Sequence, residues 1–288
     1  MKEKIKILAE LTKIRITFFV SITTVFGYIC YLPEFSGKIF APIVGLLLLA
    51  SGSAVINHIQ ELETDAKMDR TKFRPIPSKR ITMRSAIKIA SILVLFGLLM
   101  LLVVGIIPFL LGVLNLFWYN VVYTPLKKIS PIAIIPGSLV GAIPPAVGWT
   151  SAGGSILDPQ ILIISFFFFI WQIPHFWLLL LVLSKDYEKA GFPTLSKIFN
   201  DKQLSRITFI WIIATVVSSF LIPLYGIIKN PFLYIILLAA GIWLTWNAAK
   251  LLNGSDQKLN FKFAFREINI FALVVMLIIS LDQLLISL

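Results

Sequence analysis

The segment NHIQELETDAKMDRTKFRP, residues 57–75, places a dense group of charges in an otherwise apolar chain. It contains four acidic side chains together with the bases Lys67, Arg70, Lys72 and Arg74. Over 288 residues the chain is 58% hydrophobic and 14% charged, whereas about 25% of residues are charged in an ordinary soluble domain. We therefore predict a polytopic membrane protein in which this segment lies at the membrane boundary.

Nine apolar runs are long enough for transmembrane helices, since about 20 helical residues cross a bilayer core of about 30 Å. Two runs contain internal prolines, Pro144-Pro145 in the fifth and Pro174 in the sixth. A lipid-facing helix loses backbone hydrogen bonds there, so both helices are expected to line an internal cavity. The fourth run is the least regular, because Pro108 and Gly112 interrupt it. The predicted fold is all-α, with spans at 15–33, 39–57, 84–104, 106–123, 131–151, 159–183, 206–226, 231–251 and 267–287.

The basic residues are distributed very unequally between the two predicted sides of the membrane. If the N-terminus is cytoplasmic, 24 of the 26 Lys and Arg residues lie in cytoplasmic segments, and only Lys38 and Lys229 lie outside. The positive-inside rule therefore predicts a cytoplasmic N-terminus. The net charge of +12 then reflects topology and contact with anionic membrane lipid, so nucleic-acid binding is not expected. The single cysteine, Cys30, is expected to be a packed apolar residue.

Polar side chains recur at every fourth position of the charged segment, at Asn57, Glu61, Asp65 and Asp69. If the second span continues as a helix, these side chains lie along one face. Carboxylate and amide oxygens one turn apart suit a hard divalent cation, especially Mg²⁺, which takes few protein oxygens and completes its shell with water and phosphate. The spacing predicts a Mg²⁺ site at the membrane boundary.

Three bases follow this oxygen series directly, at Arg70, Lys72 and Arg74. Cations beside a carboxylate-bound metal suit a diphosphate, because arginine grips oxygens in pairs and the metal neutralises the leaving group. The alternative is a solvated, salt-bridged loop whose bases only obey the positive-inside rule.

Two other predicted cytoplasmic segments carry similar chemistry. YTPLKK, residues 123–128, presents Tyr123 and Lys127 at the inner end of the fourth span, where they are able to reach the same phosphates. KDYEKAGFPTL, residues 185–195, supplies Asp186 as a further acidic ligand. By themselves, a pair of lysines is usually a membrane anchor, and acids in a basic loop occur by chance.

The segment WQIPHFW, residues 171–177, places Gln172 and His175 near a proline inside the sixth span. A lone intramembrane histidine is often a packed hydrogen-bonding residue. Because burying a polar side chain in a membrane is costly, a functional role is an equal alternative.

Together these segments resemble the UbiA superfamily of intramembrane prenyltransferases, and within it the protoheme IX farnesyltransferase (heme O synthase) branch. The resemblance covers nearly the whole chain. The Asn-x-x-x-acid-x-x-x-Asp series marks the superfamily, whereas the heme branch is marked by MDRTKFRP, GAIPPAVGW (141–149) and WQIPHF. Several positions depart from the family pattern: Glu61 and Glu63 stand where Asp is usual, and Ala190 replaces a second acid that many superfamily members carry but the heme branch tends to lack. Thr194-Leu195-Ser196 stands where Met-Leu-Pro is usual.

The resemblance implies one transmembrane domain over residues 1–288, in which nine helices surround a central cavity. Helices one to four and five to eight are candidate related halves, and a ninth helix follows them. It also implies Mg²⁺ held by acidic motifs and a prenyl diphosphate bound at the cytoplasmic end. The implied metal ligands are Asn57, Glu61, Asp65 and Asp186, which with Arg70 are also the catalytic residues. The implied diphosphate-binding residues are Arg70, Lys72, Arg74, Tyr123, Lys127 and Lys185, and the acceptor pocket contains Trp171, Gln172 and His175.

The activity implied by the resemblance is transfer of farnesyl from farnesyl diphosphate to a vinyl group of heme b in the cytoplasmic membrane. Heme-pathway or oxidase-assembly proteins are the expected partners. One alternative is a related prenyltransferase acting on an aromatic quinone precursor. An alternative of another class is a transporter for a lipophilic or anionic solute, although a transporter would place its ionisable residues near the bilayer midplane.

Overall fold

The computed structural model describes residues 2–34, 36–252 and 257–286, which form helices and turns without a strand. Within these ranges, nine helical stretches have the length and composition to cross a membrane, as predicted. The long helices are α2 (Ile14–Tyr31), α3 (Phe40–Gln60), α5 (Met83–Val104), α6 (Ile106–Phe117), α9 (Leu139–Ser151), α10 (Pro159–Val182), α12 (Asp201–Leu224), α13 (Pro231–Ala249) and α14 (Gln257–Ile286).

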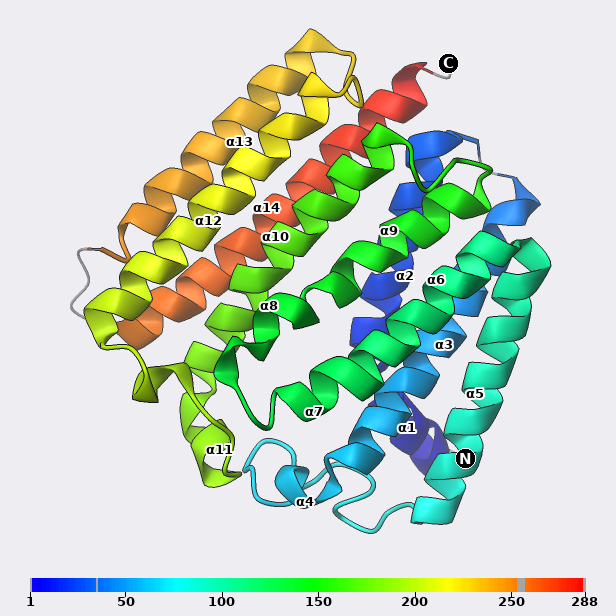
Figure 1. Cartoon of the computed structure of the whole chain (residues 1–288), viewed down its shortest axis with the longest axis vertical. Helices are drawn as coiled ribbons and strands as arrows, with labels where there is room; N and C mark the ends of the chain where they lie inside the picture. Colours follow the sequence, from blue (N-terminus) through cyan, green and yellow to red (C-terminus); the bar gives the residue numbers. More distant parts are fainter. Residues whose placement is uncertain (1, 35, 253–256, 287–288) are drawn as a thin grey trace.

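Short helical elements extend or connect these helices. The α-helical ones are α1 (Lys2–Leu11), α4 (Leu62–Asp65), α7 (Thr124–Leu126), α8 (Ile134–Gly137) and α11 (Ser184–Lys189). A π-helical turn, η2 (Trp118–Tyr123), joins α6 to α7, and 3₁₀ turns lie at Gly37–Ile39, Pro131–Ala133 and Leu195–Lys197. Figure 1 shows α1, α4, α7 and α11 at one end of the molecule, which we call the loop end.

Six long helices form a closed ring by successive contacts: α2 with α3, α3 with α6, α6 with α9, α9 with α10, α10 with α14, and α14 with α2. The other three lie outside this ring. Helix α5 packs against α3 and α6, while α12 packs against α10 and α13 packs against α12 and α14 (Figure 1). This arrangement places the ring helices around a central space and leaves the outer helices to cover them.

Helices α2 and α9 also pack closely against each other across the ring, at the end away from the loops. A Cβ atom on Gly27 would lie 2.0 Å from the Pro145 carbonyl oxygen, and one on Gly148 would lie 1.9 Å from the Thr24 carbonyl oxygen. Only glycine permits this approach, because any side chain would collide with backbone. The two helices therefore cross in contact here, and neither Gly27 nor Gly148 lines the cavity described below.

The two proline-containing helices predicted to line the cavity, α9 and α10, both do so. Pro144 lines the cavity, as expected, whereas the neighbouring Pro145 packs against α2. Pro174 is buried within α10 and is not itself part of the cavity wall, but α10 lines the cavity through Trp171, Gln172 and His175, as predicted. Pro108 lies in the first turn of α6, where no backbone N–H bond is lost, and the helix continues through it. Cys30 is packed in the apolar core, as predicted.

Two predicted helix starts were too late. Helix α12 begins at Asp201 rather than 206, because Asn200 and Gln203 form a capping box at its N-terminus. Helix α14 begins at Gln257 rather than 267, since Lys262 and Arg266 extend the helix beyond its apolar part. The predicted end of this span, residue 287, lies outside the described residues. Hydropathy locates the apolar part of a helix, whereas hydrogen bonding decides where the helix begins.

Candidate active site

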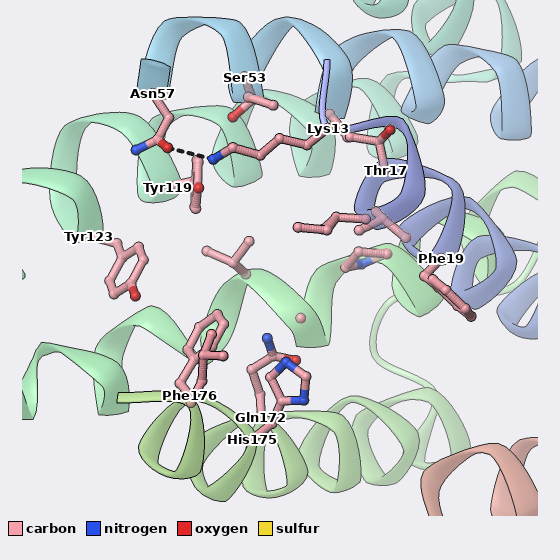
Figure 2. A pocket seen from close by; sticks show the side chains of 18 of the residues that line it. Lys13, Thr17, Phe19, Ser53, Asn57, Tyr119, Tyr123, Gln172, His175 and Phe176 are labelled. Atoms are coloured by element: carbon pink, nitrogen blue, oxygen red, sulfur yellow. Dashed lines mark hydrogen bonds between the residues drawn. The ribbon is translucent and has the colours of Figure 1, made fainter. Parts of the chain in front are cut away.

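A cavity of about 800 Å³ lies inside the helix ring and extends to the loop end. All six ring helices contribute to its wall, which is mainly apolar. Figure 2 shows Lys13 and Asn57 on one wall and Gln172, His175 and Phe176 on the wall opposite. The cavity therefore has a polar part near the loops and an aromatic part deeper in the ring, which we call the polar end and the aromatic middle.

Three predicted metal ligands lie on the cavity wall at the polar end: Asn57, Glu61 and Asp65. Helix α3 ends at Gln60, yet the spacing of one helical turn persists. The Glu61 N–H donates to the Asn57 carbonyl at 3.0 Å, and the Asp65 N–H donates to the Glu61 carbonyl at 2.7 Å. Both carboxylates are buried, with Glu61 5% and Asp65 0% exposed. Helical geometry thus directs three oxygen-bearing side chains to one face, as predicted.

The series does not continue to Asp69. The chain turns after Asp65, where the Thr71 hydroxyl donates to the Asp65 carbonyl oxygen at 2.9 Å. Asp69 is exposed and forms ion pairs with Lys72 and Lys189. A helix continued through Asp69 was therefore the wrong expectation, and the oxygen-rich face ends at Asp65.

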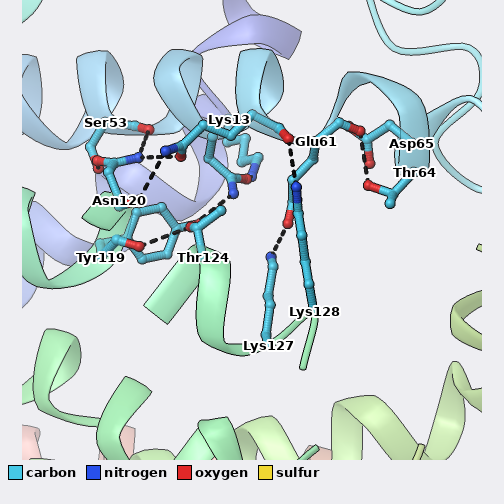
Figure 3. Close-up of polar contacts among 12 residues, drawn as sticks. Lys13, Ser53, Glu61, Thr64, Asp65, Tyr119, Asn120, Thr124, Lys127 and Lys128 are labelled. Atoms are coloured by element: carbon cyan, nitrogen blue, oxygen red, sulfur yellow. Dashed lines mark hydrogen bonds and ion pairs between the residues drawn. The ribbon is translucent and has the colours of Figure 1, made fainter. Parts of the chain in front are cut away.

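Two partly buried bases pair with these carboxylates. Nη1 of Arg74 donates to both Asp65 oxygens, at 2.8 and 2.7 Å, and the Lys127 ammonium forms an ion pair with Glu61 (Figure 3). Burial opposes the charge on Glu61, yet Lys127 lowers the pKa of this carboxyl. Burial likewise opposes the charge on Lys127, whereas the Glu61 carboxylate raises its pKa. Both pairs are charged, so the polar end contains anionic and cationic groups together.

Lys13 is a third base at the polar end, and the sequence prediction missed it. Its backbone is left-handed, with φ 50° and ψ 45°, at the break between α1 and α2. The side chain enters the cavity and donates to Asn57 Oδ1 at 2.7 Å (Figures 2 and 3). Burial, with help from Arg74 and Lys127, lowers the pKa of Lys13 to about 7. A lysine before the first apolar span signals topology only, and the left-handed turn that directs it inward is not visible in the sequence.

The π-helical turn η2 presents Tyr119 and Tyr123 to the cavity. Tyr123 stacks on Phe176 with ring centroids 5.7 Å apart and planes 4° from parallel. The Lys127 ammonium lies 5.4 Å from the centre of the Tyr123 ring. A Cβ on Gly137 would come within 2.4 Å of this ring, so glycine is needed there. Tyr123 therefore joins the polar end to the aromatic middle. π-Helical turns are frequent at functional sites.

The two cytoplasmic loops predicted to share the metal contact each other. The Arg70 backbone N–H donates to Asp186 Oδ2 at 3.3 Å, and Lys189 pairs with Asp69. Arg70 lines the cavity, whereas Asp186 does not. The Lys189 hydrogen bond, together with Lys72, lowers the pKa of Asp69 to about 2. Asp186 is thus held beside the polar end without reaching it.

Two predicted diphosphate-binding lysines are not part of the cavity wall. Lys72 is exposed and pairs with Asp69 at 2.9 Å, and Lys185 is an exposed residue of α11. The other four predicted members of that set, Arg70, Arg74, Tyr123 and Lys127, line the cavity.

The predicted acceptor residues, Trp171, Gln172 and His175, all line the aromatic middle from α10. The Trp171 indole donates to the Ile268 carbonyl of α14 at 3.1 Å. The His175 ring lies between Trp171 and Phe265, with a centroid distance of 5.0 Å to each. A Cβ on residue 141 would meet the Gln172 amide at 2.5 Å, so Gly141 makes room for this side chain.

The heme-branch motif GAIPPAVGW divides between the cavity and the helix contact. Gly141 and Pro144 line the cavity, whereas Pro145 and Gly148 contact α2. Trp149, at the far end of the motif, donates to Asp158 Oδ2 at 3.0 Å. Only the first half of this motif is therefore positioned to contact a substrate.

The donor chemistry at the polar end fits Mg²⁺, because the carboxylates and amide offer oxygen ligands only. Among the described residues, however, no three His, Cys, Asp or Glu side chains form a preassembled metal cluster. The carboxylates of Glu61 and Asp65 are paired with bases instead. Water and phosphate oxygens complete the coordination of Mg²⁺ in many sites, so a small protein donor set is sufficient.

Fold and site together define a membrane protein that accommodates a substrate with an anionic head and an apolar body. Residues 17–272 match the UbiA prenyltransferase family, and the chain belongs to this family. It is a prenyltransferase.

Curated relatives cover most of the chain. A protein from Oleidesulfovibrio alaskensis is 30% identical over 97% of both chains, and one from Christiangramia forsetii is 32% identical over 92% of this chain and 89% of its own. A third, from Geobacter sulfurreducens, is 35% identical over 66% of this chain and 70% of its own. All three are named protoheme IX farnesyltransferase.

Solved structures share the fold at lower identity. A digeranylgeranylglyceryl phosphate synthase structure superposes with a TM-score of 0.80 at 19% identity, covering 98% of this chain and 99% of its own. A UbiA homologue from Archaeoglobus fulgidus, bound to GPP and Mg²⁺, superposes with a TM-score of 0.69 at 14% identity, covering 95% and 99%.

Proposed function

We propose that this prenyltransferase transfers a farnesyl group from farnesyl diphosphate to a vinyl group of heme b, forming heme O for respiratory oxidases. One structural observation carries the proposal: a single cavity joins a cation-rich polar end to an aromatic middle that contains His175. The names of relatives at 30–35% identity support the heme acceptor. Membership of the UbiA family sets aside the transporter alternative.

Residues at the polar end bind and activate the diphosphate. Lys13, Arg74 and Lys127 bring basic groups from three separate segments; Arg74 and Lys127 face carboxylate oxygens, and Lys13 donates to the amide oxygen of Asn57. Asn57, Glu61 and Asp65 would hold Mg²⁺, with Asp186 adjacent in the neighbouring loop. When bound, Mg²⁺ supplies the charge that neutralises diphosphate oxygens. The C1–O bond of the farnesyl group breaks, its electron pair remains on diphosphate, and an allylic cation is left.

The aromatic middle then controls the fate of this cation. Tyr119, Tyr123 and Phe176 line the wall beside the polar end, where aromatic faces stabilise positive charge and exclude water. The electron pair of the vinyl double bond forms the new carbon–carbon bond. The positive charge moves to the carbon next to the porphyrin, water adds there, and one proton is released. The products are hydroxyethylfarnesyl heme, diphosphate and a proton.

Purified protein supplied with farnesyl diphosphate, Mg²⁺ and reduced heme b tests the proposal. Mass spectrometry should detect a product heavier than heme b by a farnesyl group plus a hydroxyl group, and 4-hydroxybenzoate should not react. Prenylation of 4-hydroxybenzoate without reaction of heme would instead support the quinone-precursor alternative. Omission of Mg²⁺ should abolish the product, and activity without any divalent cation would contradict the metal assignment.

We place the polar end of the cavity on the cytoplasmic side of the cell membrane, because 24 of 26 basic residues fall on that side in the predicted topology. Ser78 and Ser196 are exposed positions in the two contacting loops. Single cysteines there, in a Cys30→Ser background, should resist an impermeant thiol reagent in intact cells and react in inverted vesicles. Labelling from outside would reverse the topology. Oxidase-assembly proteins are the partners expected on this side.

A further inference from the structure

Two cavity-lining side chains from different helices meet in the aromatic middle. His175 of α10 and Asn269 of α14 both line the cavity, and Nδ1 of His175 lies 2.8 Å from Oδ1 of Asn269. The sequence prediction included His175 but not Asn269. Residue 269 lies in the last span, far from the motifs that mark the family, so no spacing in the sequence connects the two.

The orientation of the Asn269 amide is decided by a second hydrogen bond. Its Nδ2 donates to the Phe265 backbone carbonyl, one turn earlier in α14, at 2.5 Å. A carbonyl oxygen only accepts, so the amide nitrogen must face Phe265 and the amide oxygen must face His175. An amide rotated by 180° would place two acceptor oxygens together.

This orientation determines which nitrogen of His175 carries the proton. Since Asn269 Oδ1 only accepts, Nδ1 of His175 must be the N–H donor. In a neutral imidazole the other nitrogen, Nε2, then carries a lone pair. No hydrogen bond to Nε2 exists within residues 2–34, 36–252 and 257–286, and the ring projects from α10 toward the cavity (Figure 2).

The surroundings favour an imidazole that binds metal. Trp171 and Phe265 hold the ring from two sides, each at a centroid distance of 5.0 Å. Histidines that ligate metals almost always donate their other N–H to an acceptor, which fixes the tautomer and the orientation of the ring. The His175–Asn269 pair has this arrangement, and His175 lies on the wall of the cavity of about 800 Å³.

We propose that Nε2 of His175 ligates the iron of the heme acceptor and that Asn269 is the positioning residue that holds His175 in this tautomer. The inference rests on the proposed function, because it assigns how that acceptor is bound. The Phe176 ring contacts both His175 and Tyr123, with a centroid distance of 5.7 Å to each. A porphyrin held at His175 would therefore lie one aromatic side chain away from Tyr123, which borders the polar end.

Heme binding by the purified full-length protein provides the test, followed by the Soret band and by electron paramagnetic resonance of the ferric complex. Wild type should show a histidine-ligated heme. His175→Gly should lose this signature, and added imidazole should restore it. Asn269→Leu, which removes the acceptor at similar volume, should weaken heme binding about 10- to 100-fold. Asn269→Asp, which retains an acceptor oxygen, should bind heme more tightly than Asn269→Leu and keep the histidine signature.

Asn247 is a matched control. It also donates to a backbone carbonyl one turn earlier, that of Trp243 at 3.1 Å, but it lies on α13 outside the cavity wall. Asn247→Leu should leave the heme spectrum unchanged. Binding of prenyl diphosphate by each variant shows that the polar end remains folded.

The possible outcomes distinguish failure of the His175 ligand assignment from failure of the proposed heme farnesylation. Heme farnesylation by wild type, with unchanged heme spectra and affinity in His175→Gly and Asn269→Leu, would overturn the ligand assignment and leave the function intact. Loss of turnover in His175→Gly with an unchanged spectrum would likewise overturn it, in favour of a base that accepts the proton from water. Failure of wild type to bind or farnesylate heme, while it prenylates another acceptor, would overturn the proposed function and the inference with it.

Discussion

The two parts of the cavity are built on different principles. At the polar end, buried charges neutralise one another, since Arg74 pairs with Asp65 and Lys127 pairs with Glu61. In the aromatic middle, the key polar group, His175, is held by a neutral amide and by ring contacts. Buried charges are costly without partners, whereas a neutral side chain requires only hydrogen bonds. We therefore expect substitutions at the polar end to cost more activity than those in the middle, and to affect a different substrate.

The largest effect is expected at the oxygen series. Asp65→Asn or Glu61→Gln should lower turnover about 10²- to 10³-fold or more, because each removes a carboxylate proposed to hold the Mg²⁺ that neutralises the departing diphosphate. Glu61→Asp should keep or raise activity. A radioactive prenyl-transfer assay in detergent, with size-exclusion chromatography to verify folding, measures this.

Glu63 provides the control for this prediction, because it is an exposed acid between the two proposed metal ligands. Glu63→Gln should retain activity. Full activity of Asp65→Asn would end the metal assignment.

A smaller effect is expected at Lys13. Lys13→Gly removes the ammonium while the left-handed backbone remains favourable, since glycine adopts positive φ freely. The KM for prenyl diphosphate should rise about 10- to 100-fold, as expected for the loss of a charged hydrogen bond. Lys79, the other described non-glycine residue with positive φ, is exposed, and Lys79→Gly should not change KM. An equal response of the two variants would show that Lys13 acts through the backbone alone.

A substitution in the aromatic middle should change the KM for the acceptor rather than the KM for prenyl diphosphate. In Gly141→Ala, the new Cβ meets the Gln172 amide at 2.5 Å and must displace this flexible side chain. We expect the KM for the acceptor to rise about tenfold, with the KM for prenyl diphosphate unchanged. Gly37→Ala is the control, because nothing lies within 4 Å of its Cβ position. A change in the KM for diphosphate would contradict the division of the cavity into two parts.

The smallest effect is expected at the loop ion pair of Asp69 and Lys189, whose side chains are 54% and 56% exposed. Asp69→Asn should change turnover less than about fivefold, because exposed ion pairs contribute little and are screened by salt. The folded pKa of Asp69 is lowered to about 2, so its contribution to stability is complete above the ordinary carboxyl pKa and is lost as pH falls toward 2. Thermal unfolding of wild type and Asp69→Asn between pH 3 and pH 7 measures the contribution to stability. A loss in turnover larger than fivefold would make the loop contact part of the active site.

Much of the site was predictable, because short-range geometry decides it. Asn57, Glu61 and Asp65 follow a one-turn spacing, and helical hydrogen bonds preserve that spacing through the end of α3. Asp69 was misplaced, since a turn stabilised by Thr71 replaces the expected helix. Lys72 and Lys185 were included for their charge alone, and charge does not reveal which way a loop side chain points.

The sequence alone determined that this is a membrane protein with nine predicted spans, and it determined the chemistry of the polar loops. Both follow from local properties, namely the length of each apolar run and the types of residue in each loop. Only the tertiary structure decided which side chains share one cavity. It directs Lys13 inward through a left-handed turn, packs α2 against α9 at Gly27 and Gly148, and brings Asn269 to His175 across 94 positions of the chain. These contacts depend on how helices pack, and packing is set by the summed shapes of many side chains rather than by any single spacing.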